Sequence, residues 1–121
     1  MNDLILVLST CKNIEETEKI ARALLDKRLA ACVNITPTSS LYVWHGNIEK
    51  AEEQILIIKT TSKLFKQVEE QIRRVHSYKV PEIISVKVDR GAKPYLDWIA
   101  ETCGEAESKL RKKRSHKSVK D

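Results

Sequence analysis

Residues 76–84, HSYKVPEII, place an imidazole, a phenol and a carboxylate in one short stretch of the chain. His76 and Glu82 are of the types that ligate metal ions, and an imidazole also transfers protons near neutral pH. Simpler interpretations exist: a histidine at the end of a helix interacts with the helix dipole, and a glutamate after Pro81 can be an ion-pair partner. Position alone favours the helix-end interpretation for His76. Tyr78 is more typical of packing than of catalysis.

Cys11 is a further candidate metal ligand, because it lies between the first apolar run and the first predicted helix. A thiol near a helix N-terminus can have a lowered pKa. The alternative, which we prefer, is an unreactive thiol. Cys11, Cys32 and Cys103 are odd in number and form no CxxC pair, so the sequence predicts neither a disulfide framework nor a zinc site.

Motifs for catalysis are missing from the sequence. It contains no Ser-His-Asp set, no glycine-rich phosphate loop and no metalloprotease signature. We therefore predict that the protein is not an enzyme and that it uses no organic cofactor.

The elements that must position these residues follow from hydrophobic periodicity and capping signals. The first part of the chain predicts a strand at 4–8 ending at Ser9-Thr10, and a helix beginning at Asn13 with Glu16 as its capping-box partner. The middle part predicts a strand at 31–35, a bend or bulge at 36–40, extended structure at 41–44, a hairpin tip at 45–47 and a strand at 48–60. The last part predicts a helix capped by Thr61 or Ser62 with Leu64, Val68, Ile72 and Val75 on one face, a strand at 83–88, and a helix with Pro94 at its first position and Gly104 as its C-cap.

The order β-α-β-β-α-β followed by a helix predicts an α+β, ferredoxin-like sandwich with a long hairpin between the second and third strands. Two helices cover one face of such a sheet, so its strands should alternate apolar and polar residues. Residues 4–8, 41–44 and 55–58 are instead apolar on both faces. We infer that neighbouring subunits cover the second face and that the long hairpin reaches them.

The net charge of +5 is concentrated at the C-terminus of the 121-residue chain. Residues 109–121 contain seven Lys or Arg and one Asp, whereas residues 1–108 are close to neutral. We predict a folded domain at 1–104 and a basic, disordered tail at 105–121. The tail can touch nucleic acid or an anionic membrane weakly, although a solubilising role is the preferred interpretation.

Targeting signals are not evident. The chain has no run of ~18 apolar residues, so no membrane span is expected. The apolar run at 4–8 is shorter than the roughly 7–15 residues of a signal peptide's hydrophobic region and no cationic segment precedes it, so we predict a cytoplasmic location.

Five blocks in register resemble the CutA divalent-cation tolerance family. They are KRLAACVNI at 27–35, SLYVWHGNIE at 40–49, ILIIKT at 55–60, HSYKVPEII at 76–84 and YLDWI at 95–99. The resemblance implies a ferredoxin-like homotrimer whose hairpins pair edge to edge, with a role involving copper or another divalent cation. By the same resemblance, His76 and Glu82 are candidate metal ligands, to which Cys11 is added from its position, and the candidate intersubunit pocket consists of Tyr42, Trp44, Glu53, Lys59, Tyr78, Tyr95 and Trp98.

The loop at 76–82 departs from the pattern usual in that family at two positions. Ser77 replaces a proline, which should make the loop less rigid. Lys79 replaces an acid and adds a cation close to His76 in sequence, which disfavours a bound divalent ion.

Three functions are compatible with these patterns. The first is a trimeric protein that binds copper or a similar divalent cation in or near an intersubunit cleft. The second is a trimeric sensor, like the PII signalling proteins, that binds a small metabolite or anion, for which Lys59 and Lys79 are better suited. The third is a structural trimer that anchors or assembles a partner protein, for which the basic tail is the candidate contact.

Overall fold

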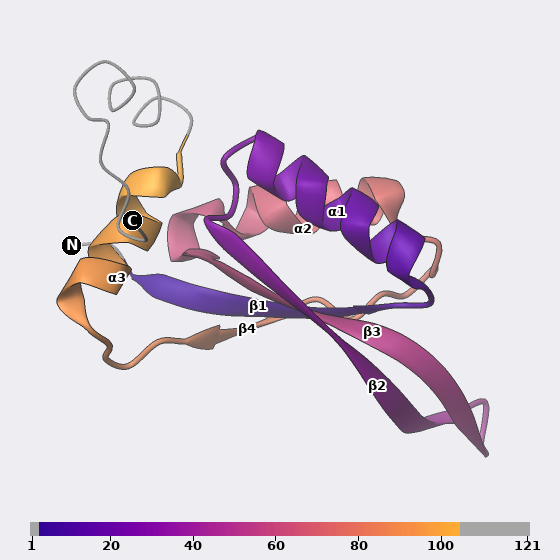
Figure 1. The fold of residues 1–121 in the computed structure, drawn as a ribbon. Coiled ribbons are helices and arrows are strands. Elements are labelled where there is room, and N and C mark those ends of the chain that lie inside the picture. The colour runs from indigo at the N-terminus through magenta and orange to yellow at the C-terminus, as the bar shows by residue number, and fades with distance from the viewer. Residues whose placement is uncertain (1–2, 105–121) are drawn as a thin grey trace.

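The computed structural model describes residues 3–104, and Figure 1 shows how the elements are arranged. The expected basic tail lies outside the described residues. The elements are β1 (Leu4–Cys11), α1 (Ile14–Asp26), β2 (Cys32–Trp44), β3 (Asn47–Thr61), the 3₁₀ helix η1 (Ser62–Leu64), α2 (Phe65–Val75), β4 (Ile84–Lys87) and α3 (Lys93–Thr102). The predicted order of strands and helices is therefore confirmed.

The four strands form one antiparallel sheet in the order β2-β3-β1-β4, and α1 and α2 lie together on one of its faces (Figure 1). The core lies between these helices and the sheet. Fully buried side chains from both layers meet there, and the largest are Ile20, Leu24, Leu56, Ile58 and Ile72. This layer fixes where β1 ends and α1 begins, which positions Cys11.

The first helix begins as its sequence predicts, with one difference. Asn13 is the N-cap, and its Oδ1 accepts a hydrogen bond from the backbone N–H of Glu16 at 2.9 Å. In a complete capping box the Glu16 carboxylate would bond back to the Asn13 backbone. Instead it accepts hydrogen bonds from Ser77, which follows α2.

Three predicted strand boundaries are wrong. β1 continues through Ser9-Thr10 to Cys11, and β4 is confined to Ile84–Lys87. β2 runs without a break through 36–40, pairing with β3 in one register from Cys32 to Trp44. Pro37 is tolerated because β2 is an edge strand, where the missing N–H need not point at a neighbour.

The start of the second helix also differs from the prediction. The 3₁₀ turn η1 precedes α2, and Thr61 makes no side-chain capping hydrogen bond. The predicted apolar face is present, because Leu64, Val68 and Ile72 are buried. At the other end of the domain, Gly104 has φ +97° directly after the cap of α3, as a helix-ending glycine requires.

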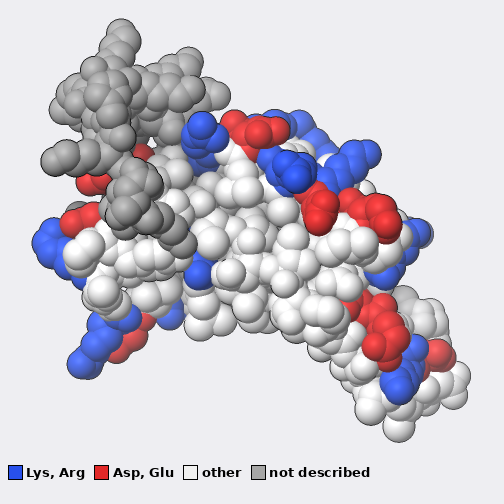
Figure 2. Space-filling model, viewed as in Figure 1, with Lys and Arg blue, Asp and Glu red and all other residues white. Residues whose placement is uncertain are grey.

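The hairpin between β2 and β3 projects beyond the rest of the sheet (Figure 1), and the space-filling view shows it standing out from the body of the molecule (Figure 2). Its turn places His45 and Gly46 at φ 50° and 81°, the positive values of a tight type I′ turn. The last β1 pair is Cys11 with Gln54, so residues 38–53 pair with each other alone. We call residues 38–53 the arm.

The sheet face opposite α1 and α2, which we call the open face, is also apolar. Register places Leu6, Leu8, Ile55, Ile57, Ile84 and Val86 on this face. Ile84 and Val86 are 52% and 50% exposed, and the other four are half-buried. The prediction of two-sided apolar strands is confirmed, and one chain leaves the open face incompletely covered.

Within residues 3–104, none of the helices combines the length and the apolar character that crossing a bilayer requires.

Candidate functional site

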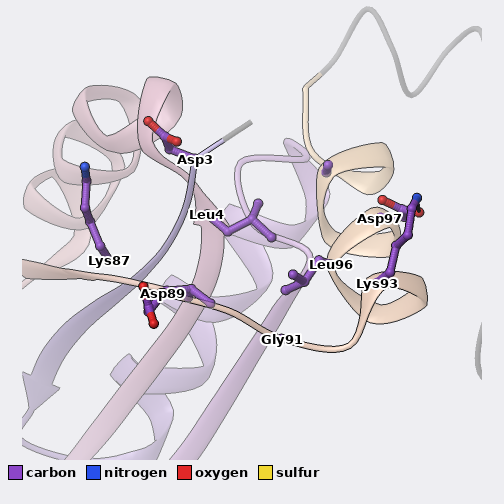
Figure 3. A pocket seen from close by; sticks show the side chains of 10 residues that line it. Asp3, Leu4, Lys87, Asp89, Gly91, Lys93, Leu96 and Asp97 are labelled. Carbon is purple, nitrogen blue, oxygen red and sulfur yellow. Dashed lines mark hydrogen bonds and ion pairs between the residues drawn. The ribbon is translucent and has the colours of Figure 1, made fainter. Parts of the chain in front are cut away.

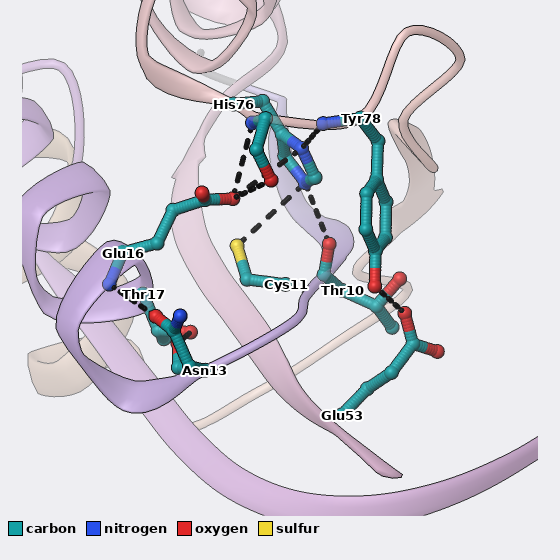
Figure 4. A network of polar contacts seen from close by, with 9 residues as sticks. Thr10, Cys11, Asn13, Glu16, Thr17, Glu53, His76 and Tyr78 are labelled. Atoms are coloured by element: carbon teal, nitrogen blue, oxygen red, sulfur yellow. Dashed lines mark hydrogen bonds and ion pairs between the residues drawn. The ribbon is translucent and has the colours of Figure 1, made fainter. Parts of the chain in front are cut away.

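Three potential metal-ligating side chains converge where β1, α1 and α2 meet. Cys11 is the last residue of β1, Glu16 lies in the first turn of α1, and His76 follows the last residue of α2. One ligand atom from each lies within 4.8 Å of the others. We call these three residues the junction, and Figure 4 shows them with their hydrogen-bond partners.

Both ring nitrogens of His76 contact the backbone. Nε2 lies 2.7 Å from the carbonyl oxygen of Thr10, and Nδ1 accepts a hydrogen bond of 3.0 Å from the backbone N–H of Tyr78 (Figure 4). A carbonyl oxygen can only accept, so Nε2 carries the proton and donates, and the ring is the neutral Nε2–H tautomer. The side chain of His76 is 0% exposed.

Glu16 ties the loop after α2 to the start of α1. Its Oε2 accepts hydrogen bonds of 3.2 Å from both the backbone N–H and the hydroxyl of Ser77, and it lies 3.6 Å from Nδ1 of His76. A negative charge in the first turn of α1 is also favourable for the helix dipole. Ser77, one of the two residues that depart from the usual family loop, is thus the residue that binds Glu16.

Cys11 is fully buried, and its Sγ lies 3.6 Å from Nε2 of His76. Burial raises the pKa of the Cys11 thiol to about 11, although a hydrogen bond with Thr17 acts in the opposite direction. The structure therefore supports an unreactive thiol, not the lowered pKa that its position before α1 allowed.

Tyr78 extends from the same loop to the base of the arm. Its hydroxyl donates a hydrogen bond of 2.7 Å to Oε2 of Glu53, which is 9% exposed. Burial, followed by the hydrogen bond to Glu53, raises the pKa of Tyr78, so the phenol stays protonated. The rings of His76 and Tyr78 also lie in contact, with centroids 4.8 Å apart.

The junction suits a soft divalent cation by donor type, because thiolate, imidazole and carboxylate are all ligands for copper or zinc. The hydrogen bonds and the protonation of these side chains, however, do not suit a divalent cation. Both nitrogens of His76 are engaged by the backbone, and the Cys11 thiol is protonated at neutral pH. The residues as folded therefore do not fit a bound cation.

The predicted ligands are only partly brought together. Cys11 and His76 are neighbours, whereas Glu82 is exposed and lies outside the junction. Glu16 was not among the predicted ligands, because its spacing from Asn13 indicated a capping-box residue. Only its contact with Ser77, 61 residues further along the chain, shows its second role.

The seven predicted pocket residues form two groups in one chain. Tyr42, Trp44, Glu53 and Tyr78 lie on or beside the arm. Lys59 lies six residues further along β3, about 20 Å away, where its Nζ donates to the Tyr95 hydroxyl at 3.1 Å and the rings of Tyr95 and Trp98 are 5.6 Å apart. Their role as a pocket between subunits stays a prediction.

A cavity of about 740 Å³ lies between the start of β1, the end of β4 and α3 (Figure 3). Its lining residues are Asp3, Leu4, Lys87, Val88, Asp89, Gly91, Lys93, Leu96, Asp97 and Ala100. Lys93 and Asp97 form an ion pair of 2.8 Å within this set. None of the residues predicted from sequence as ligands or pocket residues lines this cavity.

The fold and the extended arm define a class of ferredoxin-like α+β proteins with an enlarged central hairpin. The model of the CutA1 divalent ion tolerance protein family matches residues 5–102, and the chain belongs to this family. The Divalent-cation tolerance protein CutA of Archaeoglobus fulgidus is 47% identical over 93 residues, 77% of this chain and 91% of that protein. The same-named protein of Thermus thermophilus is 41% identical over 99 residues, 81% and 96% of the two chains.

Solved structures agree with this assignment. The Archaeoglobus fulgidus structure, described as a periplasmic divalent cation tolerance protein, has a TM-score of 0.80 and 44% identity, covering 82% of this chain and 97% of that chain. CutA1 from Oryza sativa has a TM-score of 0.83 and 35% identity, covering 86% and 96%. The resemblance recognised from the five sequence blocks is therefore confirmed, together with the fold.

Proposed function

We propose that this protein acts in divalent-cation tolerance as a homotrimer that binds copper or a similar divalent cation in or near the clefts between subunits. The observation that carries the proposal is the apolar surface that a single chain leaves uncovered. This surface consists of the open face and the arm, where Leu41, Val43 and Ile48 are 71%, 71% and 78% exposed. Exposed apolar area of this kind marks an interface.

The two faces of the arm suit different parts of such an assembly. Leu41, Val43 and Ile48 share one face, and Tyr42, Trp44 and Glu53 share the other. β2 is also an edge strand, so its free backbone groups can pair with a second chain. A copy docked along the arm would close a cleft lined by aromatic rings and the carboxylate of Glu53.

Glu53 is the most favourable donor for a cation in this cleft. One carboxylate oxygen, Oε2, accepts from Tyr78, and within residues 3–104 no hydrogen bond reaches the other oxygen. A carboxylate accepts through both oxygens, so Oε1 is available to a cation. Glu82 is exposed and supplies a second candidate carboxylate.

The test is a calorimetric titration of Cu²⁺ into the full-length, tag-free chain, combined with native mass spectrometry. We expect a trimer that binds Cu²⁺ with micromolar affinity, about −8 kcal/mol, and at least tenfold weaker binding in Glu53→Gln. Glu18→Gln, which neutralises an exposed carboxylate on α1, is the matched control and should bind like the wild type. A monomer, or equal binding by both variants, would contradict the proposal.

A second candidate function is the sensing of a small anion. It rests on Lys59, whose ammonium group donates to the neutral hydroxyl of Tyr95 and lies 5.4 Å from the centre of that ring. Neither contact neutralises the positive charge. Binding of an organic anion that is lost in Lys59→Met and retained in Glu53→Gln would favour this function over cation binding.

We also propose that the protein is a binding protein without turnover. Its cytoplasmic location stays a prediction from the N-terminal sequence. The role of an assembly anchor, which depends on the basic tail, falls outside the described residues.

A further inference from the structure

We infer that the junction of Cys11, Glu16 and His76 is a closed hydrogen-bonded joint that positions the loop 76–82, and that it is not where this protein holds a divalent cation. The inference concerns the location of the cation and so rests on the proposed function for that part. The structural role of the joint stands independently of it.

The first step is the geometry of the imidazole. A metal ion bound by histidine lies about 2.0–2.1 Å from a ring nitrogen, in the direction of its lone pair. Nε2 carries a proton in this direction and donates it to the carbonyl oxygen of Thr10, with 2.7 Å between Nε2 and that oxygen. The lone pair of Nδ1 accepts the backbone N–H of Tyr78, with 3.0 Å between the two nitrogens. A cation would have to displace a backbone partner and leave that group buried without a hydrogen bond, which is costly.

The second step is access. The side chain of His76 and the residue Cys11 are each 0% exposed, so neither presents a donor atom to solvent. Oε2 of Glu16 is already shared between two donors on Ser77.

The contacts of His76 and Glu16 together position the loop 76–82. His76 bonds the end of β1 through Thr10, and it receives the Tyr78 backbone N–H. Glu16 bonds the start of α1 to Ser77, directly after His76. These contacts fix the backbone of the loop from two sides, and the hydroxyl of Tyr78 then reaches Glu53 at the base of the arm. His76 is therefore a positioning residue for Tyr78 and, through it, for Glu53.

The decisive test uses full-length protein labelled with ¹⁵N at histidine, with the ring signals of His76 observed by NMR as Zn²⁺ is added. The ring of a closed joint gives the Nε2–H tautomer and shows no change in its signals at saturating Zn²⁺. Because this readout does not depend on whether a cation binds elsewhere, failure of the proposed function leaves it intact. An Nδ1–H tautomer, or His76 signals that shift in proportion to Zn²⁺, would overturn the inference.

A second measurement removes the other two donors without touching His76. Cys11→Ala and Glu16→Gln are titrated with Cu²⁺, with Glu18→Gln as the control for an exposed carboxylate on α1. We expect the first two variants, once shown to be folded, to bind Cu²⁺ within twofold of the wild type. A tenfold or greater loss in both, with the wild type and Glu18→Gln binding alike, would place the cation in the junction and overturn the inference.

Discussion

The junction and the arm differ in how far the chain itself satisfies their hydrogen-bonding groups and buries their side chains. In the junction, the ring nitrogens of His76 and Oε2 of Glu16 have partners, and the side chains are largely buried. The arm exposes large apolar side chains, and within residues 3–104 its two strands pair only with each other. A cluster of side chains of metal-ligating types can therefore serve only to stabilise the fold, and we expect binding at the apolar surface that a single chain leaves exposed.

The largest expected effect comes from changing the arm. Val43→Asp places a charge on a side chain that is 71% exposed in one chain and that we propose is covered in the trimer. Burying an unpaired charge is strongly unfavourable, so we expect the trimer to dissociate. Native mass spectrometry measures the change, and Glu18→Asp on the outer face of α1 is the control. A trimer that survives Val43→Asp would show that the arm does not carry the assembly.

The next largest effect is expected from His76→Ala. The substitution leaves the Thr10 carbonyl and the Tyr78 N–H without partners and empties a buried site, so we expect a loss of about 3 kcal/mol of unfolding free energy. Thermal unfolding at fixed chain concentration measures it, since the stability of an oligomer depends on concentration. Lys66→Ala, on the exposed face of α2, should change stability by less than about 0.5 kcal/mol. Equal stability of the two variants would refute a structural role for His76.

A smaller effect is expected from Tyr78→Phe, which removes the hydroxyl and keeps the ring against His76. Loss of a hydrogen bond to the nearly buried Glu53 carboxylate should cost about 1–2 kcal/mol. If Glu53 binds the cation, Tyr78→Phe should also change the Cu²⁺ affinity, as the loop no longer fixes the carboxylate. Tyr95→Phe, at the other group of aromatic residues, is the comparison for the affinity measurement.

The smallest effect is a dependence of stability on alkaline pH. Burial raises the pKa of Cys11 from 9.0 to about 11, so the folded chain keeps a proton that the unfolded chain loses between these values. Stability from this group is fully present below about pH 9 and is lost as the pH rises towards 11. Thermal unfolding between pH 8 and 10.5 should therefore show a shallower decline in Cys11→Ala than in the wild type. Identical slopes would indicate a thiol that ionises equally in both states.

Local patterns were enough to predict much of this fold. The periodic apolar positions predicted both helices of the sandwich, Asn13 predicted the start of α1, and the Gly46 turn predicted the hairpin. The strands at 4–8 and 55–58, apolar on both faces, also predicted that one chain would leave a sheet face incompletely covered. These features depend on residues close together in sequence, so the sequence expresses them directly.

The features that were missed depend on distant parts of the chain. β2 passes through Pro37 because it lies at the sheet edge, and strand order is a tertiary property. The second partner of Glu16 is Ser77, and His76 finds Thr10 across 66 positions. The sequence therefore made His76 and Cys11 candidate metal ligands, whereas the hydrogen bonds that engage the imidazole became visible only in three dimensions.

The most direct test of a cation-binding trimer is a native mass spectrum of the full-length wild-type chain with and without Cu²⁺. We expect a species of three times the 13.9 kDa chain mass that gains copper. A spectrum dominated by the single chain, or a trimer that gains no copper, would contradict the proposal that the surface left open by one chain becomes the cation-binding cleft of the assembly.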